Sequence, residues 1–185
     1  MAYSKNSTEA FTGGSGQMAV MGELLHHQCN AAIPLVDVGT DVFAFRDDRE
    51  EVARIQVKTA TGTQYKRSDG YSADFRVPID QLSRADNPKL FYALAVRLTD
   101  GWGGIIVISR SKLKELRDEG CGSVIKNKKT KKLALKLLIQ FRHEQAERKR
   151  DLTAICGNTD LTAFINAWTT LPPMKPPVPI DPPAG

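Results

Sequence analysis

The stretch from Ile33 to Thr59 constrains the fold most, because it contains three apolar runs with only short gaps between them. The runs are rich in β-branched and aromatic residues, and Gly39 and the charged stretch 47–51 separate them. This pattern is typical of strands joined by tight turns. Gaps this short join neighbouring antiparallel strands, so the sequence predicts a three-stranded meander. The predicted strands span residues 33–37, 41–46 and 52–59.

Helices and further strands flank this meander. A helix is predicted from Ser15, a residue type favoured at helix N-termini, because apolar residues recur at helical spacing from Met18 to Cys29. Residues 133–141 fit helical spacing in part, but their apolar alternation favours a strand. The other predicted elements are a loop at 60–74, a short helix at 79–85, strands at 89–98 and 103–109, a helix from 109 or 111 to Gly120, and a helix at 159–170.

These elements form one mixed α/β domain, which we place at residues 15–170. Residues 1–14 are polar and glycine-rich, and we expect a flexible leader there. Residues 171–185 contain seven prolines, which favours an extended, disordered tail. The chain of 185 residues is long enough to bury a substantial core.

The composition of the chain limits which cell compartment and which class of partner are expected. No apolar run has the length of a membrane span or the pattern of a signal peptide. The three cysteines are scattered and odd in number, which argues against a disulfide framework and for a cytoplasmic protein without membrane contact. A net charge of +5 and a pI near 9.2 favour a polyanionic partner.

The run "RIQVKTA", residues 54–60, contains the first candidate site residues. Side chains alternate across a strand, so Gln56 and Lys58 share one face, while Ile55 and Val57 point to the other. An amphipathic strand with one wet face explains this arrangement without any function. If that face is covered, however, the lysine needs a carboxylate partner.

Two acidic residues upstream could supply such a partner. If residues 41–46 and 52–59 pair as a hairpin, Phe45 or Arg46 lies near Val52 or Ala53. Counting back from there brings Asp41 alongside positions 56 to 58. Glu23, on the preceding helix, can pack over the same edge.

The expected cluster therefore combines two carboxylates, an amide oxygen and an ammonium group. Carboxylate and amide oxygens suit Mg²⁺ or Mn²⁺, and such an ion activates water and binds phosphate oxygens. A nearby lysine can orient the water or neutralise developing negative charge. The cluster predicts metal-dependent hydrolysis of phosphodiester bonds, with nucleic acid, and DNA in particular, as the expected substrate.

Three segments, "MGELLHH", "DVGTDVFAF" and "IQVKTA", together resemble the PD-(D/E)XK nuclease superfamily. The resemblance covers residues 15 to 98, about half of the chain. It implies a restriction-endonuclease-like α/β core, in which a helix and a three-stranded meander are followed by a helix and a strand. The remaining C-terminal strands and helices would extend that core.

The resemblance also implies a role for each residue of the cluster. Asp41 would be the central metal ligand, Gln56 would lend its side-chain oxygen, and Val57 its backbone carbonyl. Lys58 would be the catalytic lysine and Glu23 an accessory ligand of the metal or of water. Gln56 departs from the commonest form, which has Asp or Glu, and matches the variant of Mrr-like members. Asp37 competes with Asp41 as the ligand.

Basic residues outside this cluster are candidates for binding a nucleic-acid backbone. The run 126–132 has five lysines in seven residues, although a solvated turn explains it nearly as well. A double-strand cutter needs two active sites, which suggests a homodimer, or a recruiting protein partner. Two alternatives stay open: a catalytically silent binding or assembly module that retains the fold, and a structural protein whose basic surface has no ligand. The candidate backbone-binding residues are Lys66, Arg67, Lys126, Lys128, Lys129, Lys131 and Lys132.

Overall fold

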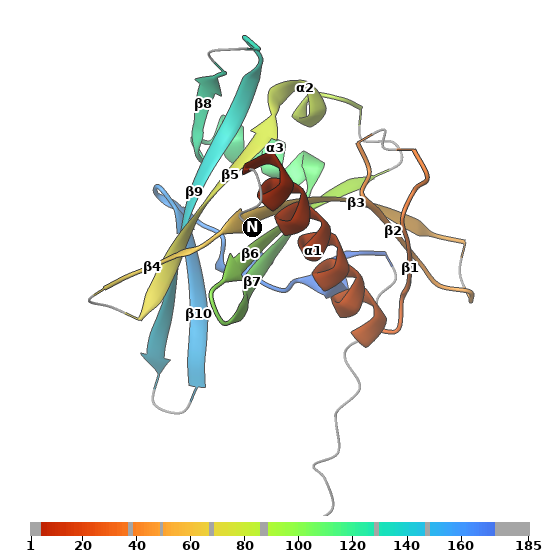
Figure 1. Ribbon diagram of the computed structural model, residues 1–185, viewed down its shortest axis with the longest axis horizontal. Coiled ribbons are helices and arrows are strands. Elements are labelled where there is room, and N and C mark those ends of the chain that lie inside the picture. The colour runs from red at the N-terminus through yellow and green to blue at the C-terminus, as the bar shows by residue number, and fades with distance from the viewer. Residues whose placement is uncertain are drawn as a thin grey trace, which may run out of the picture.

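The computed structural model describes residues 5–36, 39–48, 50–66, 69–85, 89–127, 130–146 and 149–172. Within these ranges the side chains of 5–7, 144–146 and 149–151 are not described. The chain folds as two β-sheets with one long helix against the first of them (Figure 1). No helix among the described residues is both long and apolar enough to cross a membrane.

The first sheet carries the predicted meander. The strand order is β1-β2-β3-β6-β7, and all neighbours are antiparallel except β3 and β6, which run parallel. A chain segment that includes the short helix α2 (Ile79–Leu82) connects β3 to β6. The strands are β1 (Asn30–Ala32), β2 (Val42–Phe45), β3 (Val52–Thr61), β6 (Leu90–Leu98) and β7 (Gly101–Ser109).

The second sheet is built from the remaining strands and packs against the first. Its order is β11-β10-β9-β5-β4, and β8 pairs with the first residues of β9. The helix α3 (Arg110–Asp118) begins at Ser109, whose Oγ accepts a hydrogen bond from the Lys112 N–H at 3.2 Å. The strands are β4 (Thr63–Gln64), β5 (Gly70–Pro78), β8 (Ser123–Lys126), β9 (Leu133–Ala146), β10 (Lys149–Cys156) and β11 (Thr159–Asp160).

Two hydrophobic layers hold these elements together. One layer lies between the sheets, where alternate residues of β6 and β7 meet alternate residues of β5 and β9. The other lies under α1 (Lys5–His26), where Val20 and Leu24 pack on Ile55 and Val57 of β3. The face of β3 that carries Gln56 and Lys58 therefore points away from α1, because side chains alternate along a strand.

The structure confirms the predicted fold class, a mixed α/β fold with additional C-terminal strands. A helix, a three-stranded meander, a short helix and a strand parallel to the third strand follow in the expected order. Residues 133–141 are strand, as their alternation predicted: Leu135, Leu137, Ile139 and Phe141 are buried. All three cysteines are buried and form no disulfide.

Several boundaries near the N-terminus differ from the sequence prediction. The first helix starts at Lys5 rather than Ser15, so residues 5–14 of the expected leader are helical. The first strand occupies 30–32 rather than 33–37, where the described residues 33–36 are not in a strand. The expected loop 60–74 is mostly strand, because β3 runs to Thr61 and β4 and β5 follow.

The predicted helix at 159–170 is wrong. Residues 159–160 form β11, and two short 3₁₀ turns follow, η1 (Thr162–Phe164) and η2 (Trp168–Thr170). Leu161 is buried in the layer between the sheets, whereas Trp168 is buried in the layer under α1. One helical face cannot serve both layers, so the chain passes around the edge of the sheet. Residues 173–185, most of the expected tail, lie outside the described residues.

This C-terminal segment also covers the outer edge of β7. Ile165 forms an antiparallel bridge with Ile106. The Asn166 N–H donates to the Ile105 carbonyl at 2.7 Å, and the Asn166 side-chain oxygen accepts from the Ile105 N–H at 3.1 Å. These bonds satisfy backbone groups that an edge strand would otherwise expose.

Candidate functional site

The hairpin of β2 and β3 sets the position of Asp41. Its register pairs Phe45 with Val52 and Val42 with Ile55. The Asp41 N–H donates to the Ile55 carbonyl at 2.9 Å, directly before β2 begins. The hairpin thus brings Asp41 within hydrogen-bond distance of the Gln56 side chain, as the sequence predicted.

The Asp41 carboxylate is fixed by two donors from β3. Its Oδ2 accepts from the Val57 backbone N–H at 2.7 Å and from Gln56 Nε2 at 2.9 Å. The side chain thus replaces the strand partner that Val57 lacks where β2 ends. The other oxygen, Oδ1, accepts no hydrogen bond from the described part of the chain. One oxygen of this half-buried carboxylate is consequently free to bind a ligand.

Lys58 shares the face of Gln56 and Asp41, since it follows Gln56 by two residues along β3. Its side chain is half-buried, and it has no hydrogen bond or ion pair with any residue that the structure describes. The strand therefore sets the face on which Lys58 lies, and no direct bond to a described residue occupies its ammonium group.

Glu23 does not join this cluster through any direct contact. It lies on α1, whose buried face packs on the opposite side of the sheet through Val20 and Leu24. Within the described residues, no hydrogen bond or ion pair links the Glu23 carboxylate to Asp41 or Gln56. The part of the chain that the structure describes contains no group of three or more His, Cys, Asp or Glu side chains able to hold a metal. Asp37, the competing ligand, lies outside the described residues.

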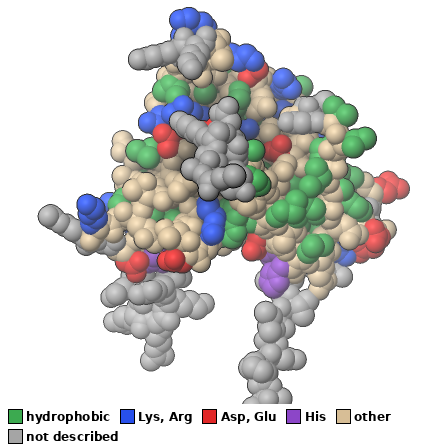
Figure 2. All heavy atoms as spheres, in the orientation of Figure 1, with side chains coloured by type: hydrophobic (Ala, Val, Ile, Leu, Met, Phe, Trp, Pro, Cys, Tyr) green, Lys and Arg blue, Asp and Glu red, His purple; other side chains and the backbone are tan. Residues whose placement is uncertain are grey.

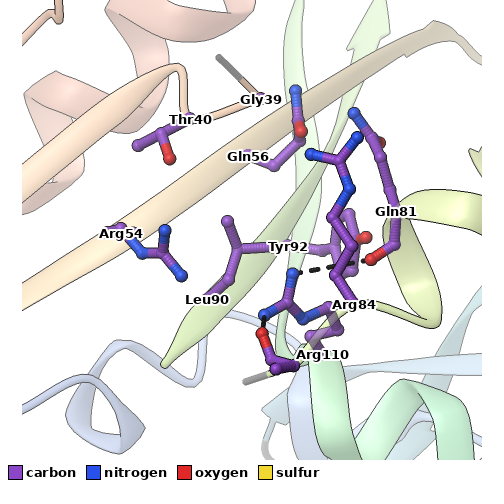
Figure 3. A pocket seen from close by; sticks show the side chains of 10 residues that line it. Gly39, Thr40, Arg54, Gln56, Gln81, Arg84, Leu90, Tyr92 and Arg110 are labelled. Carbon is purple, nitrogen blue, oxygen red and sulfur yellow. Dashed lines mark hydrogen bonds between the residues drawn. The ribbon is translucent and has the colours of Figure 1, made fainter. Parts of the chain in front are cut away.

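Gln56 also lines a pocket of about 120 Å³ (Figure 3). Arg54 comes from β3, Arg84 follows α2, and Arg110 begins α3. Among the described residues, three arginines and no carboxylate line the pocket. The lining residues are Gly39, Thr40, Arg54, Gln56, Gln81, Arg84, Ala85, Leu90, Tyr92 and Arg110.

Gly39 marks the point on which the polar groups of the pocket converge. A Cβ placed on Gly39 would lie 3.5 Å from Gln81 Nε2, 3.8 Å from Gln56 Oε1 and 3.9 Å from Arg84 Nη1. The residue has a φ of +92°, a left-handed conformation that glycine adopts readily and other residues do not. Glycine therefore both permits the turn before β2 and leaves the space between these groups open.

Arg110 forms the rigid side of the pocket. Its side chain is only 5% exposed, and its guanidinium donates to the backbone carbonyls of Gln81, at 3.5 Å, and of Ala85 (Figure 3). These bonds tie the segment after α2 to the start of α3. Gln81 Oε1 is buried there without a hydrogen-bond partner in the described structure.

The convergence of the three arginines was not predicted, because Arg84 and Arg110 lie far from Gln56 in the sequence. Arg84 is separated from Gln56 by β4, β5 and α2, and Arg110 by two further strands. Arg54 precedes Gln56 by two residues and therefore lies on the same face of β3. This spacing is the feature of the sequence that could have indicated a role for Arg54 at the site.

The basic residues expected to bind nucleic acid are only partly described. Lys66 is exposed beyond β4, and Lys126 ends β8. Lys131 and Lys132 are exposed in the turn before β9, where Lys131 donates its N–H to the Asn127 carbonyl at 2.9 Å. Figure 2 shows lysine and arginine side chains at the end of the molecule where β8, β9 and α2 lie. Arg67, Lys128 and Lys129 lie outside the described residues.

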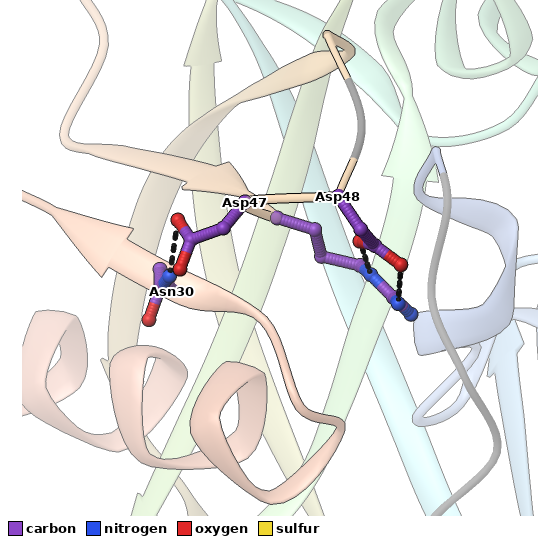
Figure 4. A network of polar contacts seen from close by, with 4 residues as sticks. Asn30, Asp47 and Asp48 are labelled. Atoms are coloured by element: carbon purple, nitrogen blue, oxygen red, sulfur yellow. Dashed lines mark hydrogen bonds and ion pairs between the residues drawn. The ribbon is translucent and has the colours of Figure 1, made fainter.

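A second polar network, at the turn between β2 and β3, has a structural role. The buried Arg46 guanidinium makes two hydrogen bonds to the Asp48 carboxylate, and Asp47 Oδ1 accepts from Asn30 Nδ2 at 3.0 Å (Figure 4). The Asp48 carboxylate raises the pKa of Arg46 through this bond. These acidic side chains therefore serve the turn and the edge strand.

Comparison with solved structures finds a bacterial homing endonuclease, I-Ssp6803I. The two chains are 16% identical, the TM-score is 0.49, and the match covers 87% of this chain and 90% of the other. No family model matches the sequence. No curated protein matches it either.

Proposed function

We propose that the protein is a metal-dependent nuclease that hydrolyses phosphodiester bonds of nucleic acid, with DNA as the expected substrate. The observation that carries this proposal is the Asp41 carboxylate, fixed against β3 by Gln56 and Val57 on the face that Lys58 shares. The arrangement agrees with membership of the PD-(D/E)XK superfamily in its Mrr-like, glutamine-containing form, which we propose with it.

The donors around Asp41 fit one divalent cation, Mg²⁺ or Mn²⁺. Asp41 Oδ1 is a hard oxygen that accepts no hydrogen bond from the described residues. The Val57 N–H points to Asp41, and the carbonyl of the same residue points to the same side of the strand. Gln56 could add its amide oxygen by rotating its amide, since its nitrogen now faces Asp41. Glu23, on the helix that packs against the opposite face of the sheet, is left out of the proposed site.

A bound ion would supply Lewis-acid stabilisation of the phosphate and a more acidic water. In this proposal, Lys58 orients that water or stabilises the negative charge that develops on the phosphate. Its half-burial strengthens the interaction relative to bulk water. Only one carboxylate contacts the site, so we expect weaker metal binding than at a site with two acidic ligands.

The experiment incubates the full chain with plasmid, linear DNA and RNA in Mg²⁺, Mn²⁺ or EDTA. Cleavage that requires the metal and is lost in Lys58→Ala supports the proposal. Lys114→Ala, an exposed lysine on α3, is the matched control. Cleavage that persists in EDTA, or that Lys58→Ala leaves unchanged, would contradict it.

A catalytically silent nucleic-acid-binding or assembly module is the second candidate. It is favoured by the Gln56 amide, whose nitrogen already satisfies Asp41 and whose neutrality lowers the charge available to a metal. This candidate predicts salt-dependent DNA binding with no cleavage in either metal, by the wild type as well as by the variants.

We also propose a homodimer or a protein partner, in either case through α1. Phe11, Met18 and Leu25 recur every seven residues on this helix and are 66%, 55% and 59% exposed. Figure 2 shows hydrophobic side chains exposed in the region of α1. The mass of the protein in solution, measured by light scattering for the wild type and for Met18→Glu, tests the homodimer. A partner other than a second copy would leave both monomeric. Cytoplasmic location stays a prediction from the sequence.

A further inference from the structure

We propose that the pocket around Gly39 is an oxyanion site that binds a second phosphate group of the nucleic acid, next to the one at Asp41. Arg84 and Gln81 would be its direct ligands. The identity of the ligand as a nucleic-acid phosphate rests on the proposed function. The oxyanion site itself rests on the geometry of the pocket alone.

The first argument is convergence. Gln81 Nε2 and Arg84 Nη1 both lie within 4 Å of a single point beside Gly39. Both atoms are hydrogen-bond donors, and they come from a helix and the residue that follows it by two. Because the glycine has no side chain, an acceptor can occupy the point between them. A group with several acceptor oxygens fits these donors best.

The second argument is charge. Arg84 is exposed at the mouth of the pocket and forms no ion pair with any described residue. Arg110 also lines the pocket, where its bonds to the Gln81 and Ala85 carbonyls hold the segment that carries Arg84. Arginine presents several N–H groups in one plane, which suits the paired oxygens of a phosphate. The pocket volume of about 120 Å³ is large enough for a phosphate group.

The third argument is the position of Gln56 between the two sites. Its nitrogen donates to Asp41, and its oxygen lines the pocket (Figure 3). A nucleic-acid strand that placed one phosphate at Asp41 would therefore carry a neighbouring phosphate into the pocket. Binding there would hold the backbone in register with the cleavage site, so Arg84 is a positioning residue in this proposal.

The test measures phosphate and DNA binding without metal, so that it does not depend on cleavage. Inorganic phosphate is titrated at constant ionic strength into the full-length ¹⁵N-labelled protein, and the side-chain signals of Arg84, Gln81 and Gln56 are followed by NMR. We expect saturable shifts of these signals, absent in Arg84→Ala. Arg76→Ala, an exposed arginine on β5, is the matched control and retains them.

Duplex DNA binding in EDTA gives the second readout. Arg84→Ala should weaken binding about tenfold, the usual effect of losing a hydrogen bond between charged groups. The slope of log affinity against log salt should fall by about one, as expected for one lost phosphate contact. Arg76→Ala should leave both quantities close to wild type. Circular dichroism confirms that each variant is folded.

The outcomes separate this proposal from the proposed function. If Arg84→Ala binds phosphate and DNA as Arg76→Ala does, the oxyanion site is refuted, even if the protein cleaves DNA. Linear, unsaturable shifts with phosphate would also refute it. If binding depends on Arg84 but neither Mg²⁺ nor Mn²⁺ supports cleavage, the oxyanion site stands and the nuclease proposal fails.

Discussion

Asp41→Ala and Asp41→Asn together test whether the carboxylate has both a structural and a chemical role. Alanine removes the acceptor of two hydrogen bonds, from Val57 N–H at 2.7 Å and from Gln56 Nε2 at 2.9 Å. Val57 is only 8% exposed, so its N–H is left without a good partner. Hydrogen bonds to a charged group contribute about 1.5–3 kcal/mol each. Since Asp41 is half-buried and water can replace part of the loss, we expect about 3 kcal/mol in total.

Asparagine keeps an acceptor for the Val57 N–H but loses the charge, so Asp41→Asn should destabilise the fold by about 1 kcal/mol. For a domain of this size, these losses lower Tm by roughly 6–12 °C for alanine and 2–4 °C for asparagine. Both variants should lose metal-dependent cleavage completely. Urea unfolding and calorimetry measure stability, and plasmid nicking measures activity.

Two results would refute this reasoning. If Asp41→Ala were as stable as the wild type, the carboxylate would not be holding β3. If Asp41→Asn cut DNA at the wild-type rate, Asp41 would not be the essential ligand of the proposed site. If Asp41→Ala is destabilised as expected but neither the wild type nor either variant cleaves DNA, the catalytically silent binding module is favoured.

Three further predictions follow from other positions. Lys58→Ala should abolish cleavage but change the free energy of unfolding by less than about 0.5 kcal/mol, because Lys58 has no hydrogen bond or ion pair in the described structure. A large loss of stability would mean that Lys58 has a structural role. Burial raises the pKa of the Tyr71 hydroxyl above its ordinary 10.0. The contribution of Tyr71 to the free energy of unfolding should therefore be full below pH 10 and decrease as the pH rises above 10. Urea unfolding at alkaline pH should show this decrease for the wild type but not for Tyr71→Phe. Gly39→Ala should lower the free energy of unfolding by about 1 kcal/mol, because the residue has a positive φ. It should also weaken phosphate binding, since the added methyl group would lie in the pocket. An unchanged affinity for phosphate would contradict the proposed position of the site.

The sequence predicted the hairpin at the site well, because local rules determine it. Short turns and the alternation of Ile55 and Val57 fix the pairing, and one residue of slip would move every side chain to the wrong face. The relation between Asp41 and Gln56 followed from counting along two strands. Glu23 was placed less well, since the direction in which a helix residue points depends on how the helix packs against the sheet.

Other features could not be predicted, because they depend on tertiary structure. The pocket brings together Arg54, Arg84 and Arg110, and no spacing in the sequence indicates that three such segments meet. The apolar residues from Leu161 to Trp168 have helical spacing, yet they are shared between two separate layers. The periodicity of apolar residues indicates which residues are buried, but it does not indicate in which of the two hydrophobic layers each residue lies.

The bonds between Asn166 and Ile105 have a practical consequence for shortened forms of the chain. A truncation before Ile165 would remove both the backbone cover of β7 and the indole of Trp168 that fills the layer under α1. The exposed strand could then recruit another molecule through its main-chain groups. Such a fragment should precipitate or form fibrils at concentrations where the intact protein remains dispersed.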